Sequence, residues 1–275
     1  MLKLAIIVPY RNRAAHLDAF IPHVRAYFAR DKVDRSVPYK VFVIEQDDDL
    51  PFNRGALLNV GFALAEPDCD YVCFHDVDYL PIWADYSAVD RPTPMLWYGA
   101  EVRPIAPGRS DQGVRNNLDQ YYSGALLVPT AQFRQVDGFA NSYWGWGFED
   151  VDLKQRFDRA GIALGRRKGT FQPLDHDNQG FKLDGTPAPI STVNQRIFDQ
   201  RWSSSEPASN DGLSTLDYQI MRRHPIPDPR PERAADWLKV SVRLKSRPSS
   251  EQVAAIAAQK RAGAATVETR KRRGR

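Results

Sequence analysis

Two groups of carboxylates could do chemistry, and the first is Asp76-Val77-Asp78. Side chains two residues apart in an extended chain share a face, so Asp76 and Asp78 would point the same way. Carboxylates held close together repel each other unless a cation neutralises them, which predicts a divalent metal. His176 could add a nitrogen ligand, and imidazole favours Mn²⁺ over Mg²⁺. The alternatives are an acidic surface turn and an ordinary loop histidine.

The second group is Glu149, Asp150 and Asp152. It follows residues 143–148, in which two tryptophans alternate with two glycines. Glycine admits backbone angles that other residues resist, and indoles are costly to expose, so we interpret this segment as a mobile aromatic flap over a ligand rather than as core. The alternative is that the acids only cap the helix that begins here. Capping would explain the acids but not the tryptophans and glycines before them.

Two arginines, Arg11 and Arg13, follow the first apolar run of the chain. Guanidinium groups match pairs of phosphate oxygens, so these residues could receive an anion; a solvated surface is the alternative. A metal and two arginines could neutralise a departing nucleoside diphosphate while a carboxylate takes a proton from an attacking hydroxyl. The chain has no P-loop, no Gly-X-Ser-X-Gly and no paired-cysteine metal motif. The pattern therefore favours transfer from a nucleotide donor.

The elements that must position these residues alternate between apolar runs and amphipathic patterns in the first part of the chain. Apolar runs predict buried strands, and a period of about 3.6 residues predicts helices. The predicted elements are strand 2–10, helix 14–29, strand 39–46, helix 52–65 and strand 71–75. This order indicates an α/β fold with a parallel, doubly wound sheet and a ligand crevice at the carboxyl ends of the strands. The arginines and the first pair of carboxylates all fall at that edge.

The second half of the chain is less regular, and no linker divides it into two cores. The predicted elements are strands 95–102 and 121–128, helices 130–136 and 151–160, a polar loop 172–185, an edge-like strand 216–223, strand 237–245 and helix 249–261. We therefore predict one domain over residues 1–245, followed by a C-terminal helix and basic tail over residues 246–275.

Composition limits the function classes. The chain has 275 residues, of which 42% are hydrophobic and 26% charged, as in a globular protein. Residues 260–275 hold seven Lys or Arg and one Glu, so the net charge of +4 comes from the tail and the body is mildly acidic. This distribution argues against nucleic-acid binding, while the tail is either a solvated end or a peripheral contact with an anionic membrane. Cys69 and Cys73 are too far apart along a strand to form a disulfide, which suits a reducing cytosol.

At these motifs the chain resembles glycosyltransferase family 7, the beta-1,4-galactosyltransferases, across residues 4–224. The matching blocks, in the same order, are Val8-Pro9-Tyr10-Arg11-Asn12-Arg13 with His16-Leu17, Phe52-Asn53-Arg54-Gly55 through Leu58-Asn59-Val60-Gly61-Phe62, Asp76-Val77-Asp78, Asn141-Ser142-Tyr143-Trp144-Gly145-Trp146-Gly147 with Glu149-Asp150, and Asp211-Gly212-Leu213. The similarity is closest to the xylose-accepting, proteoglycan-linker type and its bacterial relatives.

The resemblance implies a GT-A (Rossmann-like) nucleotide-sugar transferase fold. It also implies an inverting, Mn²⁺-dependent transfer of galactose from UDP-galactose to a sugar hydroxyl in a beta-1,4-type linkage, with xylose as a candidate acceptor. By motif it assigns UDP binding to Arg11, Arg13, Phe52 and Arg54; the nucleotide sugar to Asp76, Val77, Trp146 and Glu149; the general base to Asp150; and the metal to Asp78 and His176. Tyr121 falls where the family's bulky aromatic disfavours an N-acetyl group, which favours galactose.

Two departures from the family pattern bear on these expectations. Leu174 and Pro173 stand where relatives supply a further metal ligand, so Asp175, Asp177 or water would complete the metal site. Val151 follows the expected base where a second acid, which helps hold the acceptor, is common. The alternatives are the same chemistry with UDP-N-acetylgalactosamine or UDP-glucose, and a sugar-binding homologue without turnover. No signal peptide or apolar run of membrane length is recognised, so we expect a bacterial cytoplasmic enzyme, at most peripheral to the inner membrane.

Overall fold

The computed structural model describes residues 2–30, 37–96, 122–174, 187–203, 210–228 and 236–273. In chain order the elements are β1 (Leu4–Tyr10), α1 (Ala14–Phe28), β2 (Tyr39–Gln46), α2 (Arg54–Ala65), β3 (Tyr71–His75), β4 (Tyr79–Trp83), β5 (Thr93–Pro94), β6 (Ala125–Pro129), α3 (Thr130–Gln135), α4 (Glu149–Arg159), β7 (Thr170–Pro173), α5 (Pro189–Trp202), β8 (Tyr218–Pro225), β9 (Trp237–Leu244) and α6 (Ser250–Arg273). Short 3₁₀ turns cover Glu66–Asp68 and Leu213–Thr215.

The main sheet has the strand order β5-β6-β3-β1-β2-β9-β8 in the described residues. Strands β3, β1, β2 and β9 are parallel, whereas β6 and β8 run antiparallel to their inner neighbours. The prediction of a parallel sheet is thus confirmed for the central strands and wrong for the outer ones. The edge position predicted for residues 216–223 is confirmed by β8, which is the last strand of the sheet.

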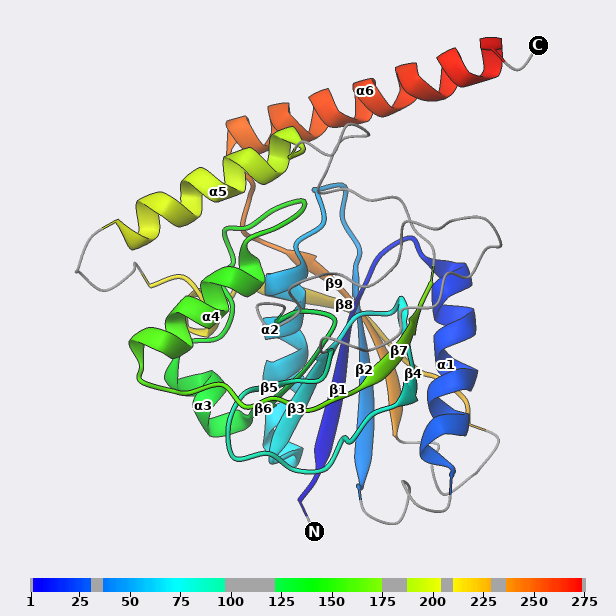
Figure 1. Cartoon of the computed structure of the whole chain (residues 1–275), viewed down its shortest axis with the longest axis vertical. Coiled ribbons are helices and arrows are strands. Elements are labelled where there is room, and N and C mark those ends of the chain that lie inside the picture. The colour runs from blue at the N-terminus through cyan, green and yellow to red at the C-terminus, as the bar shows by residue number, and fades with distance from the viewer. Residues whose placement is uncertain are drawn as a thin grey trace.

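Strand β1 shows why the sheet is covered on both faces. Ile6 and Val8 contribute to one apolar cluster, which includes α1, and Ile7 contributes to another, which includes α2, α3 and α4. All seven residues of β1 are buried, as expected for a central strand between two helical layers. Figure 1 shows α1 on one side of the sheet and α2, α3 and α4 on the other. This layering brings the ends of β1 and β3 to a common edge.

Several elements in the second half differ from the prediction. Strands β4 and β7 form a separate antiparallel pair, and β7 occupies the beginning of the segment predicted as a polar loop. Pro81 lies within β4, and proline is tolerated there because a two-stranded ribbon has only edge strands. The strand predicted at 95–102 is not formed at its beginning, because β5 ends at Pro94 and Leu96 makes only an isolated bridge to Gly169. Its residues from 97 onward lie outside the described ranges.

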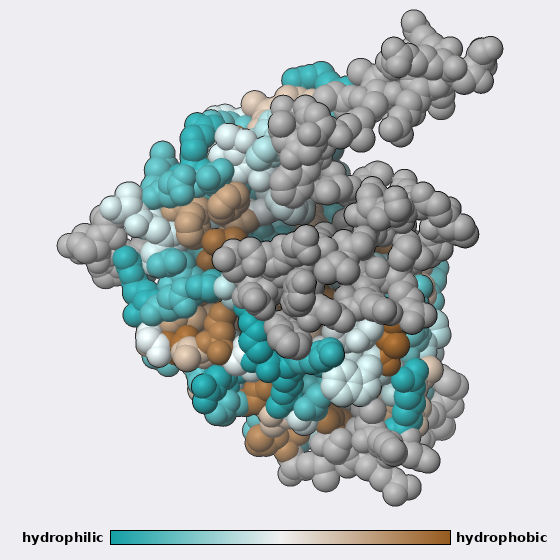
Figure 2. All heavy atoms as spheres, viewed as in Figure 1, coloured by the Kyte–Doolittle hydropathy of each residue, from teal (hydrophilic) through white to brown (hydrophobic). Residues whose placement is uncertain are grey.

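Helix α5 was not predicted, although a sequence signal exists. Pro189 occupies its first turn, and Ile190, Val193 and Ile197 recur at helical spacing. These residues pack against Ala255 and Ile256 of α6. Figure 1 shows α6 lying across α5 and continuing beyond the body of the molecule, and Figure 2 shows apolar side chains gathered between α5 and α4. Helix α6 is longer than the predicted helix 249–261.

Two further observations concern membrane spans and disulfides. In the described part of the chain, no helix combines the length and the apolar character that a membrane span requires. Cys69 and Cys73 are both free, which confirms that they do not bridge.

Candidate functional site

The predicted site residues lie at the carboxyl edge of the central strands. Arg11 and Arg13 follow β1, and Asp76 and Asp78 follow β3. Arg54 is the first residue of α2, and α4 begins at Glu149. Parallel strands present their carboxyl ends at one edge, so residues distant in sequence meet there. In the described residues, the predicted site residues therefore lie together at this edge of the sheet.

Arg54 joins two of these carboxylates. Its Nη2 lies 2.7 Å from Asp76 Oδ1, and its Nη1 lies 3.4 Å from Glu149 Oε1. Burial works to lower the pKa of Arg54, but Asp76 and then Glu149 raise it above its usual value, so the guanidinium stays charged. Arg54 therefore holds the start of α4 against the turn that follows β3.

The two acids beside Arg54 bind protons more readily than exposed carboxylates do. Burial raises the pKa of Glu149 to about 7, the charge of Asp150 adds to the increase, and Arg54 opposes it. Burial likewise raises the pKa of Asp76; Arg54 lowers it, and the neighbouring Asp78 raises it. The acids repel one another in a partly dry site, an arrangement that added positive charge would stabilise.

Asp78 is the carboxylate to which the family motif assigns the metal. It is 8% exposed, and its Oδ2 lies 3.0 Å from Arg13 Nη1. Its backbone carbonyl accepts a 2.6 Å hydrogen bond from the Leu174 N–H, so the chain leaving β7 meets Asp78 at Leu174. The predicted ligands Asp175 and His176 come next in the sequence but lie outside the described residues.

The donor chemistry here fits a hard divalent cation. Asp76 and Asp78 are close enough for the charge of Asp78 to raise the pKa of Asp76, which is the repulsion that a cation relieves. In the ranges that the structure describes, no group of three or more His, Cys, Asp or Glu side chains could hold a metal. The described residues therefore provide part of a ligand set, and the rest of the prediction falls on residues 175 and 176.

Arg11, Phe52 and Val77 line the same edge. Arg11 Nη1 donates to the backbone carbonyl of Leu50, which draws the residues before α2 toward the end of β1. Phe52 is half-buried, and its carbonyl accepts a 2.7 Å hydrogen bond from the Gly145 N–H. Val77 is 5% exposed, so only a small part of its side chain could touch a ligand. Tyr121, the remaining predicted substrate residue, lies outside the described ranges.

His75 contacts the backbone of Asp76, a role that the sequence analysis did not predict. Its Nδ1 lies 2.9 Å from the Asp76 carbonyl oxygen, and its Nε2 lies 3.0 Å from the Tyr86 hydroxyl. A carbonyl can only accept, so Nδ1 carries the hydrogen and the Tyr86 hydroxyl donates to Nε2. Burial lowers the pKa of His75 to about 4, which keeps the ring neutral. The imidazole is therefore a fixed support for the turn rather than a charged group.

The aromatic loop, residues 142–148, differs in part from the predicted flap. Trp144 is 1% exposed and belongs to the core, whereas Trp146 is 38% exposed and can meet a ligand. Gly145 and Gly147 have φ of 83° and 95°, which glycine adopts without strain. Phe148 has φ of 76°, an unusual value for a bulky residue, and its ring packs against Phe198 of α5.

Asp150 occupies the first turn of α4 and is half-buried. Its Oδ1 accepts a 2.8 Å hydrogen bond from the Val151 N–H, and Val151 itself is 39% exposed. A small apolar hollow of about 10 Å³ lies behind Asp150 and Arg54, beside Tyr122. A space of that size holds about one water molecule and no sugar ring, so this hollow is not an acceptor site.

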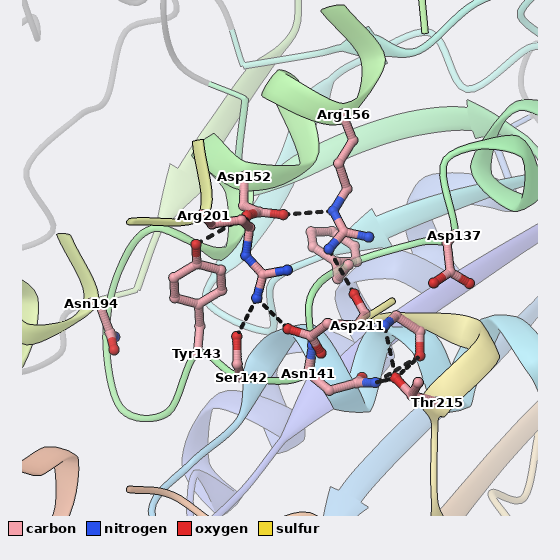
Figure 3. A network of polar contacts seen from close by, with 12 residues as sticks. Asp137, Asn141, Ser142, Tyr143, Asp152, Arg156, Asn194, Arg201, Asp211 and Thr215 are labelled. Atoms are coloured by element: carbon pink, nitrogen blue, oxygen red, sulfur yellow. Dashed lines mark hydrogen bonds and ion pairs between the residues drawn. The ribbon is translucent and has the colours of Figure 1, made fainter. Parts of the chain in front are cut away.

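Asp152 belongs to a buried network and not to the open site (Figure 3). It is 0% exposed and accepts from the Tyr143 hydroxyl at 3.0 Å and from Arg156 Nε at 2.6 Å. Arg201 Nε lies 3.2 Å from the same carboxylate, and Arg201 Nη2 also binds Asp211. Asp152 therefore stabilises the packing around α4, whereas Glu149 and Asp150 lie at the site. Only its spacing of four from Arg156 gave a sequence signal for this role.

Buried side-chain amides join three of the family-matching blocks, through Asn59, Asn141 and the pair Asp211-Gly212. Asn59, inside α2, accepts from the Phe139 N–H at 2.9 Å and donates to Asn141 Oδ1 at 3.0 Å. Asn141 Nδ2 donates to the Gly212 carbonyl at 2.7 Å, and its N–H donates to Asp211 at 2.8 Å. These buried amides fix the chain that leads into the aromatic loop.

Fold and site together define an α/β protein of the GT-A class, with acids and arginines gathered at one edge of a central parallel sheet. The crystal structure of the catalytic domain of Drosophila beta-1,4-galactosyltransferase 7 with xylobiose matches it with a TM-score of 0.65 and 26% identity, covering 90% of this chain and 95% of that chain. A point variant of that protein, crystallised with manganese, UDP-Gal and xylobiose, matches with a TM-score of 0.64.

Sequence comparisons agree with the structural ones. Residues 1–87 match the N-terminal region of glycosyl transferase group 7, and residues 103–177 match a family described as the N-terminal domain of galactosyltransferase. Beta-1,4-galactosyltransferase 7 of Drosophila melanogaster is 31% identical over 231 residues, covering 81% of this chain and 64% of the relative. Human beta-1,4-galactosyltransferase 1 is 33% identical over 228 residues, covering 82% of this chain and 53% of the relative. The chain belongs to glycosyltransferase family 7, and it spans less than two thirds of the length of these relatives.

Proposed function

We propose that this chain transfers galactose from UDP-galactose to a sugar hydroxyl with inversion at the anomeric carbon, in a Mn²⁺-dependent reaction. The observation that carries the proposal is the meeting of Arg13 with Asp78, and of Arg54 with Asp76 and Glu149, at the edge where α4 presents Asp150. Family membership and the 26% identical neighbour crystallised with manganese, UDP-Gal and xylobiose support the same reaction.

Each residue has a role that follows from its position. Arg11 and Arg13 would hold the diphosphate, because paired guanidinium donors match phosphate oxygens. Glu149 would accept hydrogen bonds from donor hydroxyls, with Arg54 holding it in place. When bound, Mn²⁺ supplies positive charge against the diphosphate; Asp78 would hold it, together with Asp175 and His176.

Asp150 is the proposed general base. It takes the proton of the acceptor hydroxyl, whose oxygen forms a bond to the anomeric carbon while the bond from that carbon to the diphosphate oxygen breaks. UDP leaves with the bonding electrons on the face opposite to attack, which inverts the configuration. Asp150 is only half-buried, and its neighbour Val151 and Trp146 of the aromatic loop are exposed, so an acceptor could reach this part of the chain.

We propose that the acceptor ends in xylose. This proposal is supported by the similar Drosophila enzyme, whose catalytic domain was crystallised with xylobiose. Val151 argues for a recognition surface partly different from that of relatives with a second acid there, since its exposed methyl groups offer an acceptor apolar contact only.

A panel of UDP-sugars, assayed with and without Mn²⁺ on xylosides, glucosides and N-acetylglucosaminides, tests the proposal. Mn²⁺-dependent transfer from UDP-galactose is the expected result, with a xyloside as the preferred acceptor. Preference for UDP-N-acetylgalactosamine or UDP-glucose would reassign the donor. Tight Mn²⁺-dependent UDP binding without transfer to any acceptor would favour the sugar-binding alternative and contradict catalysis.

We further propose that the protein works in the cytoplasm of a bacterium and contacts an anionic membrane through α6. The free thiols of Cys69 and Cys73 support a reducing compartment, and exposed Lys260 and Arg261 begin the basic part of α6. Sedimentation with vesicles containing phosphatidylglycerol tests the membrane contact, which should weaken as salt is raised. Equal sedimentation with neutral vesicles would contradict it.

A further inference from the structure

Gln252 of α6 makes hydrogen bonds with all parts of its side-chain amide. Its Oε1 accepts from the Ser249 backbone N–H at 3.0 Å, and the backbone N–H of Gln252 donates to Ser249 Oγ at 3.2 Å. These two bonds form a capping box at the start of the helix. Its Nε2 donates to the Ser142 carbonyl at 2.9 Å and to Asn194 Oδ1 at 3.0 Å. The capping box fixes which end of the amide faces the aromatic loop, because only the nitrogen can donate to these two oxygens.

Asn194 of α5 extends this contact along the loop. Its Nδ2 lies 3.1 Å from the carbonyl oxygens of Trp144 and Trp146 and 3.2 Å from that of Gly147. Asn194 is 0% exposed and Gln252 is 2% exposed, so water cannot replace these donors without a structural change. Two buried amides, one from each C-terminal helix, thus hold four carbonyls of the aromatic loop.

Apolar contacts hold the same loop. A Cβ built on Gly145 would lie 2.7 Å from Ile190 Cγ1 of α5 and 3.2 Å from Ile256 Cδ1 of α6. The backbone of the loop therefore packs directly against both helices. The loop passes directly into Glu149 and Asp150, the first residues of α4.

We propose that helix α6 is a working part of the transfer site, and that Gln252 is a positioning residue that holds the aromatic loop, and with it Trp146, in the conformation needed for transfer. This inference rests on the proposed function for its catalytic consequence but not for the contact itself. The contacts with the aromatic loop come from the first two turns of α6, through Gln252 and Ile256.

Gln252→Glu is the sharpest test, because glutamate also forms a capping box at this position while an ionised carboxylate has no hydrogen to donate to the loop. Gln252→Met serves as a second variant of similar size without charge, should the carboxylate prevent folding. Glu251→Gln is the matched control: it alters the neighbouring residue and its surface ion pair with Arg196 but no contact with the loop.

The first readout is amide hydrogen exchange in peptides covering residues 142–148, which requires no activity. We expect exchange at least about fivefold faster in Gln252→Glu or Gln252→Met than in Glu251→Gln, since a lost buried donor leaves a carbonyl unsatisfied. Unchanged exchange in both Gln252 variants would overturn the inference, even if the wild-type protein transfers galactose efficiently.

The second readout is steady-state kinetics with the preferred UDP-sugar. A positioning role predicts a fall in kcat of about fivefold or more, with the Kd for UDP in Mn²⁺ changed less than about twofold, because Gln252 bonds to Ser142 and Asn194 and not to Arg11, Arg13 or Arg54. An equal loss in Glu251→Gln would show a merely structural effect and overturn the role. If the wild-type protein transfers no sugar, the galactosyltransferase proposal fails, and the exchange experiment still decides whether Gln252 holds the loop.

Discussion

Arg13 Nη1 lies 3.0 Å from Asp78 Oδ2, so the carboxylate assigned to the metal is paired with an arginine assigned to the diphosphate. Asp78, expected to bind the metal ion, and Arg13, expected to bind the diphosphate, are thus in contact in the structure. The side chain of Asp78 is 11% exposed and that of Arg13 is 27% exposed, which leaves room for a ligand to reach both. An Arg13 that turns toward a diphosphate would release Asp78 for the cation that accompanies it.

Asp78→Ala should abolish Mn²⁺-dependent UDP binding, because Asp78 is the described carboxylate to which the family motif assigns the ion. Calorimetry with UDP, with and without Mn²⁺, measures this directly. Asp68→Ala is the control, since Asp68 pairs with Lys40 on the surface. Binding equal to that of the control would move the metal to another part of the chain.

Asp150→Asn should lower kcat by about a hundredfold or more while leaving UDP and Mn²⁺ binding intact, as the loss of a general base does. Asparagine keeps the shape and can still accept the Val151 N–H bond, so the fold should not change. The matched control is Asp158→Asn, near the other end of α4, where Asp158 pairs with Lys154. Turnover near that of the control would refute the assignment of the base.

His75 should make stability depend on pH. Its folded-state pKa of about 4 lies below the usual 6.5, so the unfolded chain takes up a proton in this range and the folded protein does not. The contribution of His75 to the free energy of unfolding is complete above pH 6.5 and falls by roughly 3 kcal/mol as the pH is lowered toward 4. Urea unfolding of wild type and His75→Gln at several pH values measures the difference. Parallel curves for the two proteins would show that His75 does not titrate as described.

Gly145→Ala should destabilise the protein for two reasons, a positive φ and contact with Ile190 at 2.7 Å. Gly161 offers a control, because its φ is 68° but a Cβ there would meet nothing within 4 Å. We expect Gly161→Ala to cost about 1 kcal/mol from the backbone alone and Gly145→Ala clearly more, measured by chemical unfolding. Equal costs would mean that α5 and α6 adjust around the loop.

Removal of residues 260–275 should leave turnover on a soluble acceptor unchanged within about twofold, because Gln252 and Ile256 remain and the helix cap at Ser249 is intact. The assay compares kcat and the acceptor KM of the full and shortened chains. A large loss of kcat would place the basic part of α6 in the site. The same pair of proteins shows whether this part binds anionic vesicles.

The first half of the fold could be predicted closely because its elements are locally determined. Strands β2 and β3 have the predicted bounds, and every residue of β1 is apolar enough to be buried on both faces. The second half was predicted less well. Pro81 weakens the strand pattern of β4. Helix α5 has apolar residues at helical spacing, but it follows a segment without clear periodicity. Both elements are stabilised mainly by partners distant in the chain, β7 and α6.

The sequence by itself determined the family, the sheet edge at which the site lies, and the residue types that meet there, because motifs and strand periodicity are local properties. Only the tertiary structure decided how the carboxylates are divided: Asp76 and Glu149 share Arg54, Asp78 faces Arg13, and Asp152 is withdrawn into a buried network. The structure also decided that Gln252 reaches the aromatic loop. Such contacts join residues as many as 110 positions apart, and the cost of burying their charges and amides is offset only when every partner is in place.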